Sequence, residues 1–532
     1  MNSETRMNET TLTDIIEQNR RLSPTAPALI DNQIVLTWEG FVGRVELTRC
    51  ALANSDIHRG DRVAIIERPC IDFVVLHYAL AGLGAIMVPV NIYWHADEIR
   101  HLLEDAQPKL FIVGETFLSA ARQALQDCEV RCELIVRGTA ALNGGETEWN
   151  VFASRTQEVE EARPNSWNDA HLLLYTSGAT GRPKGALISQ RRTVLDGVSA
   201  VAAFGVRPRW RFLNYLPMFH TGAWDYIKQY FLVGGSVVIM DHFEPGVAID
   251  LLQRHRCDAV FGVPLVLRQI LQHPSFATSD MSALKLLAYG SYDPSQVMEE
   301  AIAGFTRQGA TELEVAQAYG LTEAGPFVTI LRPEDSRRTL SSVGTPPPGV
   351  IVELLDENLI PVAKGSVGEI CVRSAALMDG YWRNTEGTCE AFRGDWLHTG
   401  DLGRFDDEGL LYVVDRIKDM IRTAGENVYA KEVEQVLVQH PAIADCAVIG
   451  LPDEEYDERV VAVVVVRLGA SVTEEEIIEF ARARIAHFKA PREVRIVPDI
   501  PKTAAGKTMK NELRRIQRER TQVEGERQSS KS

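Results

Sequence analysis

A short loop, YTSGATGRPKG (residues 175–185), combines small hydroxyl residues, glycines and one lysine. Its small residues allow several backbone N–H groups to converge on one anion, while the hydroxyls and the lysine add further donors. The common phosphate loop places its lysine directly after a glycine, whereas Lys184 follows Pro183. The composition therefore predicts either a polyphosphate site of another kind or a glycine-rich surface turn. The candidate phosphate contacts are Thr176, Ser177, Gly178, Ala179, Thr180, Gly181 and Lys184.

The segments around this loop alternate between two patterns. Short β-branched runs such as RVAIIE, KLFIVGE, CELIVRG and SVVIMD are separated in places by helical patterns such as IDFVVLHYALAGLG and ADEIRHLLEDA. Such alternation is typical of parallel sheets that are covered by helices. The sequence therefore predicts an α/β fold with mainly parallel sheets, in which the run HLLL before Tyr175 forms a buried strand.

Two changes of pattern divide the chain. Between Leu340 and Val414, glycine-rich turns separate short strands, which predicts a β-rich lobe. After Asp415, a helical pattern (AKEVEQVLVQH) and an apolar strand (RVVAVVVVRL) indicate a separate small α/β unit. We predict an N-terminal domain over residues 1–415 and a small mobile C-terminal domain over residues 416–532, with a disordered, charged tail after about residue 517.

The composition argues against several classes of function. The formal net charge of −17 disfavours nucleic acid as a partner, because phosphate backbones require clustered Lys and Arg. The N-terminal residues lack the apolar core of a signal peptide, and the longest apolar runs are too short to span a membrane. The eight cysteines contain no CxxC pair. These features favour a reduced cytoplasmic protein that acts on small molecules, and they leave a homodimer open.

Five motifs, in order along the chain, carry a resemblance to a known superfamily. The loop at residues 175–185 is followed by LPMFHTGAW, QAYGLTEAGP, WLHTGDLGRFDDEGLLYVVDRIKDMIRTAGENVYAKEVE and PKTAAGKTMK. Together they resemble the signatures of the adenylate-forming superfamily, which includes acyl- and aryl-CoA synthetases, peptide-synthetase adenylation domains and beetle luciferases. The resemblance extends from about Thr37 to Asn511. It implies ATP and Mg²⁺ as cofactors and, for the CoA synthetases, coenzyme A as a further substrate.

The resemblance implies a role for each polar residue of the AYGLTEAG motif. Glu323 is assigned to Mg²⁺, for which a carboxylate oxygen is a suitable ligand. Thr322 is assigned to phosphate, and Tyr319 would lie against the adenine through its flat ring. Gly320 would let the nucleotide approach the backbone closely. Considered singly, Glu323 would more often be an exposed turn residue. The other nucleotide contacts that we predict here are Gly290 and Ser291.

The same resemblance assigns roles to Asp401, just before the predicted C-terminal domain, and to three residues within that domain. Asp401 and Arg416 would hold the ribose, and Lys418 matches the hinge about which the small domain rotates. Lys507 matches the catalytic lysine of the first half-reaction. Attack of a carboxylate on the α-phosphorus brings two anions together, and a mobile cation that touches both lowers that barrier. Without the resemblance, these residues would be interpreted as solvated surface groups or turn residues.

The second half-reaction implied by the resemblance is attack by a thiol after the small domain has rotated. The loop RTAGENV would then enter the site, and its small residues would let a narrow pantetheine arm pass. His220 matches an aromatic gate between the acyl pocket and the phosphates, although a lone histidine is more often a core residue. The predicted CoA loop consists of Thr423, Ala424, Gly425 and Glu426.

The predicted acyl pocket is where this sequence departs from the superfamily pattern. An aspartate that faced this pocket, Asp225 or Asp293, would favour a polar or cationic substituent on the acid. Exposed aspartates are the more common case, and they would leave a fatty or aromatic acid equally suitable. The predicted pocket residues are His220, Trp224, Asp225, Tyr289 and Tyr292.

These inferences converge on an ATP- and Mg²⁺-dependent carboxylic acid–CoA ligase. It would form an acyl-AMP and pyrophosphate, and then an acyl-CoA thioester and AMP. The first alternative is an adenylating enzyme whose acceptor is a carrier-protein thiol, an amine or another nitrogen nucleophile. The second is a non-catalytic nucleotide-binding protein that kept the fold. The joint presence of Lys507, Glu323 and Asp401 favours an enzyme.

Overall fold

The computed structural model describes residues 9–126, 128–157, 165–176, 183–290, 295–423, 426–453, 456–502, 508–517 and 520. The described chain forms two compact units. The first comprises Met1–Val352 and Cys371–His398, and the second comprises Glu353–Ile370 and Thr399–Ser532. The predicted domain boundary at Asp415 lies inside the second unit. The predicted site residues outside the described part of the chain are Ser177, Gly178, Ala179, Thr180, Gly181, Ser291, Tyr292, Ala424, Gly425 and Lys507, and the tail after residue 520 lies outside it as well.

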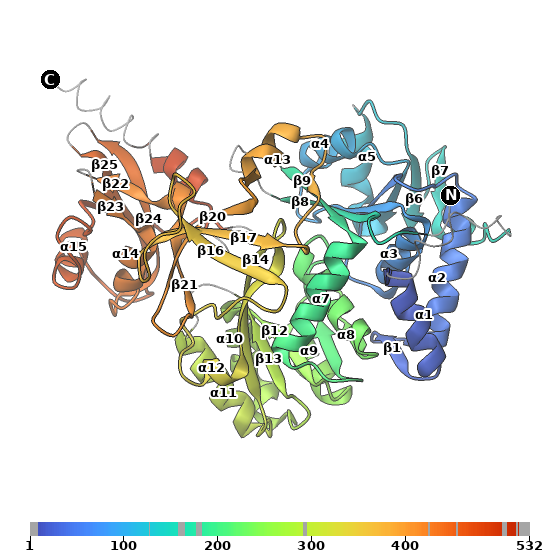
Figure 1. Ribbon diagram of the computed structural model, residues 1–532, viewed down its shortest axis with the longest axis horizontal. Helices are drawn as coiled ribbons and strands as arrows, with labels where there is room; N and C mark the ends of the chain where they lie inside the picture. Colours follow the sequence, from blue (N-terminus) through green and yellow to red (C-terminus); the bar gives the residue numbers. More distant parts are fainter. Residues whose placement is uncertain are drawn as a thin grey trace. The chain divides into compact units, whose positions relative to one another are not determined.

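Two sheets, each of eight strands within the described residues, form the framework of the first unit (Figure 1). The inner pairs of the first sheet are parallel, and its two edge pairs, β14–β15 and β1–β2, are antiparallel. Its strands, in spatial order, are β15 (Gly325–Leu331), β14 (Glu314–Leu321), β13 (Leu286–Tyr289), β12 (Ala259–Gly262), β10 (Arg211–Asn214), β11 (Ser236–Ile239), β1 (Pro27–Ile30) and β2 (Val35–Thr37).

The second sheet combines a parallel region with an antiparallel edge. Strands β8 and β9 form an antiparallel pair, and β18 pairs with β9 in the same sense. The remaining pairs are parallel. Its strands, in spatial order, are β18 (Gly380–Tyr381), β9 (Lys184–Ser189), β8 (Ala170–Thr176), β4 (Ile86–Pro89), β3 (Arg62–Ile66), β5 (Leu110–Gly114), β6 (Glu133–Arg137) and β7 (Glu146–Glu148).

The apolar runs of the sequence become the buried strands of these sheets. The predicted runs RVAIIE, KLFIVGE, CELIVRG and SVVIMD contain β3, β5, β6 and β11, respectively. Strands of a parallel sheet that is covered on both faces have to be apolar along their whole length, and every residue of β5 and β11 is buried. The mixed α/β class with a large N-terminal region and a small C-terminal unit is therefore confirmed.

Helices cover both sheets, and their ends follow local signals in the sequence. Thr11 caps α1 by a capping box with Asp14, and Gly84 ends α3 in the left-handed conformation at φ +68°. Helix α3 is almost entirely buried, which explains its apolar sequence. The helices of this unit are α1 (Leu12–Leu22), α2 (Trp38–Ala53), α3 (Ile71–Leu83), α4 (Ala96–Ala106), α5 (Leu118–Gln126), α6 (Trp149–Ala153), α7 (Gln190–Phe204), α8 (Thr221–Leu232), α9 (Pro245–Arg254), α10 (Pro264–Gln272), α11 (Ser295–Arg307), α12 (Pro333–Ser336) and α13 (Thr385–Ala391).

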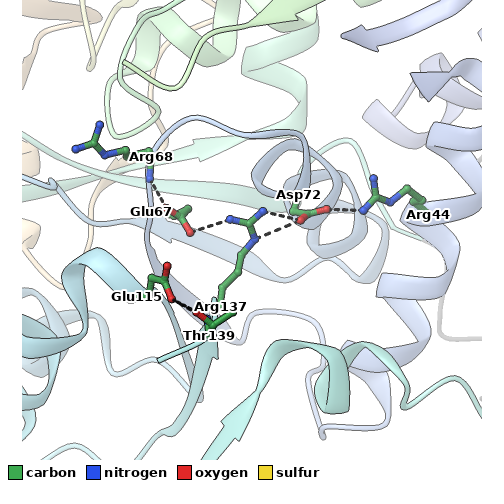
Figure 2. A network of polar contacts seen from close by, with 7 residues as sticks. All are labelled: Arg44, Glu67, Arg68, Asp72, Glu115, Arg137 and Thr139. Carbon is green, nitrogen blue, oxygen red and sulfur yellow. Dashed lines mark hydrogen bonds and ion pairs between the residues drawn. The ribbon is translucent and has the colours of Figure 1, made fainter. Parts of the chain in front are cut away.

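A polar network joins the carboxyl end of β6 to the residue that follows β3 and to helices α2 and α3 (Figure 2). Arg137, the last residue of β6, donates to Glu67 Oε2 at 3.0 Å and to Asp72 Oδ2 at 2.9 Å. Asp72, in the first turn of α3, also accepts from Arg44 of α2 at 2.7 Å. The carboxylates and guanidinium groups satisfy one another, so we interpret this network as a structural tie between the strand ends and the helices.

The second unit contains its own sheet and core. Strands β22, β23, β24, β25 and β26 form this sheet, and residues of α14 and α15 pack against it. The predicted helix AKEVEQVLVQH and strand RVVAVVVVRL contain α14 and most of β25. The elements are β21 (Leu411–Arg416), β22 (Ile421–Thr423), β23 (Glu426–Val428), α14 (Ala430–Leu437), β24 (Ile443–Asp453), β25 (Asp457–Val466), α15 (Glu474–Arg482) and β26 (Glu493–Ile496).

Three strands of the β-rich region continue from one unit into the other. They are β16 (Val350–Leu355), β17 (Gly368–Ser374) and β20 (Trp396–Phe405). Strand β19 (Phe392–Arg393) pairs with the start of β20, and β21 pairs with its later part. Among the residues that the structure describes, no helix has the length and apolar character needed to span a bilayer.

Candidate functional site

The β8–β9 hairpin holds the base of the predicted phosphate loop. Thr176, the last residue of β8, lies opposite Lys184, the first residue of β9. The backbone partner of Tyr175 is Gly185, where a Cβ would lie 2.8 Å from the side chain of Leu173. The antiparallel pairing therefore brings Thr176 and Lys184 together from the two ends of the loop. Residues 177–182 lie outside the described chain, so their contacts with phosphate stay predictions.

Glu323 lies on the turn between β14 and β15, close to the hairpin. Thr176 Oγ1 donates to Glu323 Oε1 at 3.1 Å, and Tyr381 Oη donates to the same oxygen at 2.9 Å. The structure records no hydrogen bond to Glu323 Oε2 from any residue that it describes. A half-buried carboxylate with one fixed and one unused oxygen fits a hard divalent cation, which takes oxygen ligands.

Glycine is required at the turn that carries Glu323. A Cβ at Gly320 would lie 2.3 Å from the carbonyl oxygen of Gly325 and 2.4 Å from the carbonyl carbon of Pro326. Any other residue at position 320 would therefore push the two strands apart. The turn is held on its other side by the backbone N–H of Met378, which donates to the carbonyl of Glu323 at 2.9 Å.

Tyr381 is a candidate site residue that the sequence analysis missed. Its strand, β18, pairs with β9, so residue 381 lies opposite Ala186. Besides its hydrogen bond to Glu323, its ring lies under the Lys184 ammonium group, with Nζ 5.3 Å from the ring centroid. Burial and the neighbouring Glu323 carboxylate raise the pKa of Tyr381, so its hydroxyl remains a donor at neutral pH. A Gly–Tyr dipeptide gives no signal for such a contact, because the partner lies 58 residues away.

The residues of β13 and β14 that were predicted to contact the nucleotide or the acid differ in their burial. Tyr319 is half-buried on β14, and Gly290 follows β13 where a Cβ would lie 3.1 Å from the ring of Phe261. Tyr289, which was predicted for the acyl pocket, is fully buried, and its hydroxyl donates to the carbonyl of Leu340 at 3.2 Å. A contact of Tyr289 with the acid therefore stays a prediction.

His220 and Trp224 begin α8 with different exposures. His220 is the residue before the helix and is exposed, with its ring 4.5 Å from the ring of Phe219. Trp224 is completely buried, and its indole N–H donates to the carbonyl of Met218 at 2.6 Å. Its ring packs on Phe73 and His77 of α3. The structure thus supports an accessible His220 and places Trp224 in the core between two helices.

Asp225, for which the sequence left a pocket-facing and a solvent-facing position open, is buried. Its carboxylate accepts from Arg192 of α7 at 2.9 and 3.1 Å and from Thr221 Oγ1 at 2.6 Å. The side chains of Arg192 and Asp225 are only 1% and 2% exposed. The sequence could not show this pairing, because Arg192 lies on another helix that packs beside α8 (Figure 1). Asp293 lies outside the described residues.

Several further titratable side chains are buried around this ion pair. Burial raises the pKa of Asp196 to about 8, despite the opposing effect of Arg192. Burial lowers the pKa of Lys228 to about 7, and it lowers that of His77 well below the ordinary value. The backbone of Gly325 packs against this cluster, because a Cβ added at residue 325 would lie only 2.7 Å from Asp196 Oδ1. The buried cluster therefore touches the strand that follows Glu323.

In the second unit, the two predicted ribose residues lie side by side. Asp401 of β20 and Arg416 of β21 are register partners, and Arg416 Nε lies 3.2 Å from Asp401 Oδ1. Asp401 is largely buried, while Arg416 is about half exposed. Burial and the nearby Arg416 charge lower the pKa of Lys418, the predicted hinge residue. The pairing brings together one acceptor and one donor that could meet ribose hydroxyls.

The predicted CoA loop and the predicted catalytic lysine are described only at their edges. Thr423, the last residue of β22, is the register partner of Glu426, the first residue of β23. Thr423 is buried, and Glu426 is exposed. On either side of the segment that contains Lys507, Lys502 and Thr508 form an isolated bridge. The roles of Lys507 and of Ala424 and Gly425 stay predictions.

Comparison with known proteins places the chain in a family. Residues 16–382 match the AMP-binding enzyme family, and residues 432–507 match the AMP-binding enzyme C-terminal domain. Feruloyl-CoA synthase from Amycolatopsis sp is 32% identical over 496 residues, which cover 93% of this chain and 96% of that protein. Indoleacetate–CoA ligase from Aromatoleum aromaticum is 30% identical over 518 residues, which cover 96% of this chain and 99% of that protein.

A solved structure extends the comparison to three dimensions. The amide bond synthetase McbA from Marinactinospora thermotolerans is 28% identical and has a TM-score of 0.81, with 94% of this chain and 99% of that chain covered. These matches confirm the predicted superfamily, the fold class and an enzyme of the acyl-CoA synthetase type. The chain belongs to the AMP-binding enzyme family and carries the C-terminal domain of that family.

Proposed function

We propose that the protein is an ATP- and Mg²⁺-dependent carboxylic acid–CoA ligase. The observation that carries the proposal is the Glu323 carboxylate, which Thr176 and Tyr381 hold by one oxygen beside the base of the phosphate loop. Lys184 contributes positive charge at the same place. A carboxylate that can bind a metal ion (Glu323) and a cationic side chain (Lys184), both beside a glycine-rich hairpin, suit the triphosphate of ATP.

The proposed chemistry has two steps. In the first, a carboxylate oxygen of the acid attacks the α-phosphorus of ATP, an acyl-AMP forms, and pyrophosphate leaves. Bound Mg²⁺ would neutralise phosphate charge, and Glu323 would hold it. Lys184 and the loop would bind the departing pyrophosphate, and Asp401 and Arg416 would hold the ribose. In the second step, a thiolate attacks the acyl carbon, the thioester forms, and AMP leaves with the bonding electrons.

For the acid, we propose an uncharged aromatic or fatty chain. Asp225 was the described residue that could have received a cationic substituent, and its carboxylate is already paired with Arg192. Trp224 and Tyr289 are buried, and their N–H and O–H groups already donate to the backbone carbonyls of Met218 and Leu340. The names of two relatives, a feruloyl-CoA synthase and an indoleacetate–CoA ligase, refer to flat aromatic acids.

A second candidate function is amide formation from the same acyl-AMP. It is favoured by the similarity to the amide bond synthetase McbA, which covers almost the whole chain. In that reaction an amine nitrogen replaces the thiolate as nucleophile, and AMP is again the leaving group. The first step, and the residues that we assign to it, would be the same.

The acceptor can be identified by measuring pyrophosphate release with a panel of acids. Fatty, cinnamic-type, indole-type and amino-substituted acids are each tested with ATP and Mg²⁺, alone, with CoA, and with simple amines. Turnover that requires CoA and yields a thioester supports the ligase. Turnover that requires an amine supports the second candidate, and the absence of release with every acid would contradict both.

Replacement of Lys507 separates the two half-reactions. Lys507→Ala is expected to lower acyl-AMP formation by at least about 100-fold, because a charge that stabilises the transition state is lost. Formation of thioester from supplied acyl-AMP and CoA is expected to remain within a few-fold of the unmodified protein. Lys510→Ala, three residues away, is a control for disturbance of the same C-terminal segment. Equal loss in both half-reactions would contradict the role given to Lys507.

A further inference from the structure

Tyr381 connects three elements of the candidate site. Two backbone hydrogen bonds fix its position. The N–H of Tyr381 donates to Thr388 Oγ1 at 2.9 Å, and the N–H of the next residue, Trp382, donates to the carbonyl oxygen of Gly185 at 2.7 Å. Strand β18 therefore places residue 381 against β9, the strand that begins with Lys184. This fixed backbone sets the position from which the side chain reaches Glu323.

The side chain of Tyr381 makes two contacts of different kinds. Its hydroxyl donates to Glu323 Oε1 at 2.9 Å, and its ring faces the Lys184 ammonium group at 5.3 Å. The first contact fixes a carboxylate that has a second oxygen to offer. The second restrains a long flexible lysine, which otherwise loses side-chain entropy when it binds phosphate.

We propose that Tyr381 is a positioning residue for both groups: its hydroxyl orients the metal-binding carboxylate of Glu323, and its ring orients Lys184 toward phosphate. This inference rests on the proposed function, since it takes Mg²⁺ and ATP as the ligands. Residues that hydrogen-bond to a metal ligand fix its orientation, and their replacement typically weakens metal binding 10- to 100-fold. Thr176 shares Oε1 with Tyr381, so we expect an effect at the lower end, about 10-fold.

The hydroxyl contribution is tested with Tyr381→Phe, which keeps the ring. Mn²⁺ replaces Mg²⁺, and its binding to the protein with saturating β,γ-methylene-ATP is measured from the electron paramagnetic resonance signal of free Mn²⁺. We expect the Mn²⁺ dissociation constant to rise about 10-fold in Tyr381→Phe. Glu323→Gln serves as the reference for loss of the ligand itself. An unchanged constant in Tyr381→Phe, with a raised constant in Glu323→Gln, would overturn the inference.

Tyr412→Phe is the matched control for loss of a phenol group. Its ring also faces a cation, Arg404 at 5.1 Å, and the structure records no hydrogen bond of its hydroxyl with the residues that it describes. We expect this variant to bind Mn²⁺ as the unmodified protein does. A tenfold loss in both variants would show that the effect is not specific to Glu323 and would overturn the inference.

The ring contribution is tested with Tyr381→Leu. Binding of ATP without a divalent cation is expected to be unchanged in Tyr381→Phe and about 3-fold weaker in Tyr381→Leu, because only the second variant loses the contact with Lys184. Equal metal-free ATP binding in both would overturn the role of the ring. None of these measurements uses an acid or CoA. If every acid fails to release pyrophosphate while these effects are observed, the proposed function is contradicted and the role of Tyr381 is retained.

Discussion

Glu323 and Asp225 are two carboxylates that the sequence placed in the candidate site, and their surroundings are opposite. Glu323 is half-buried, and two hydroxyl groups donate to one of its oxygens. Asp225 is fully buried, and Arg192 and Thr221 together occupy both of its oxygens. The first carboxylate has an oxygen to offer to a ligand, while the second is already paired inside the protein.

The difference shows how burial and pairing distinguish a ligand group from a structural group. A buried carboxylate needs a compensating cation, because desolvation of an unpaired charge is costly. Arg192 provides that cation for Asp225 from a neighbouring helix. The hydrogen-bond donors recorded for Glu323 among the described residues are the neutral hydroxyls of Thr176 and Tyr381, so a cation such as Mg²⁺ would complete its surroundings. Each of the following predictions tests one side of this comparison.

The largest expected effect is the loss of stability on removal of the buried carboxylate. Asp225→Ala leaves the Arg192 guanidinium buried without its partner, so we expect the free energy of unfolding to fall by about 3–5 kcal/mol. Chemical denaturation, followed by the change in midpoint, measures this loss. The control is Asp250→Ala, which removes one partner of an exposed pair with Arg254 and should cost less than about 1 kcal/mol. Similar losses in both variants would contradict the structural role of Asp225.

Replacement of Glu323 should lower activity strongly and stability little, which is the reverse of the effect expected for Asp225. Glu323→Gln keeps the size and an acceptor oxygen but removes the negative charge. We expect pyrophosphate release to slow by about 100-fold, or roughly 2.7 kcal/mol, with little change in the unfolding midpoint. Glu334→Gln, which alters an exposed glutamate on α12, is the matched control. A variant that is unstable but active would mean that Glu323 is structural in the way that Asp225 is.

The smallest expected effect concerns the pH dependence of stability near the buried ion pair. The pKa of Asp196 in the folded protein is raised to about 8 by burial and by Asp225, against the effects of Arg192 and Lys228. The folded state therefore binds this proton more tightly than the unfolded state, in which the pKa is near 4. The stability that this proton contributes is present at low pH and is lost as the pH rises toward 8, by on the order of 1 kcal/mol per pH unit.

Asp196→Asn isolates this effect, because its side chain does not titrate. Between pH 5 and pH 7, we expect the unmodified protein to lose stability relative to Asp196→Asn. The pKa of Lys228 is about 7, so this lysine stays mostly protonated over most of that range and contributes little to the difference. Thermal unfolding of both proteins across the range measures it. A constant difference would show that Asp196 keeps the same charge in the folded and unfolded states.

The predictions made from the sequence were most successful for features that depend on residues adjacent in the chain. The apolar runs identified β3, β5, β6 and β11, because a strand in a covered parallel sheet is apolar throughout. The order of the motifs identified the superfamily, and the family matches confirmed it. The sequence also placed Thr176 and Lys184 at the ends of one loop, and the antiparallel pairing of β8 and β9 brings them together.

Contacts between distant segments could not be predicted in the same way. Tyr381 gave no signal in the sequence, and only the pairing of β18 with β9 places its hydroxyl beside Glu323. The burial of Asp225 depends on Arg192, which lies 33 residues earlier on a different helix. Neither residue type nor spacing along the chain specifies which of these side chains will meet.

The sequence by itself therefore determined the fold class and the superfamily, and it predicted which groups would bind nucleotide and metal. Local patterns suffice for this, since strand periodicity, turn chemistry and ordered motifs are written in adjacent residues. Only the tertiary structure decided which carboxylate keeps an oxygen for a ligand and which is neutralised inside the protein. That outcome depends on the long-range packing of β18 on β9 and of α7 on α8, which sets the partners and the desolvation of each charge.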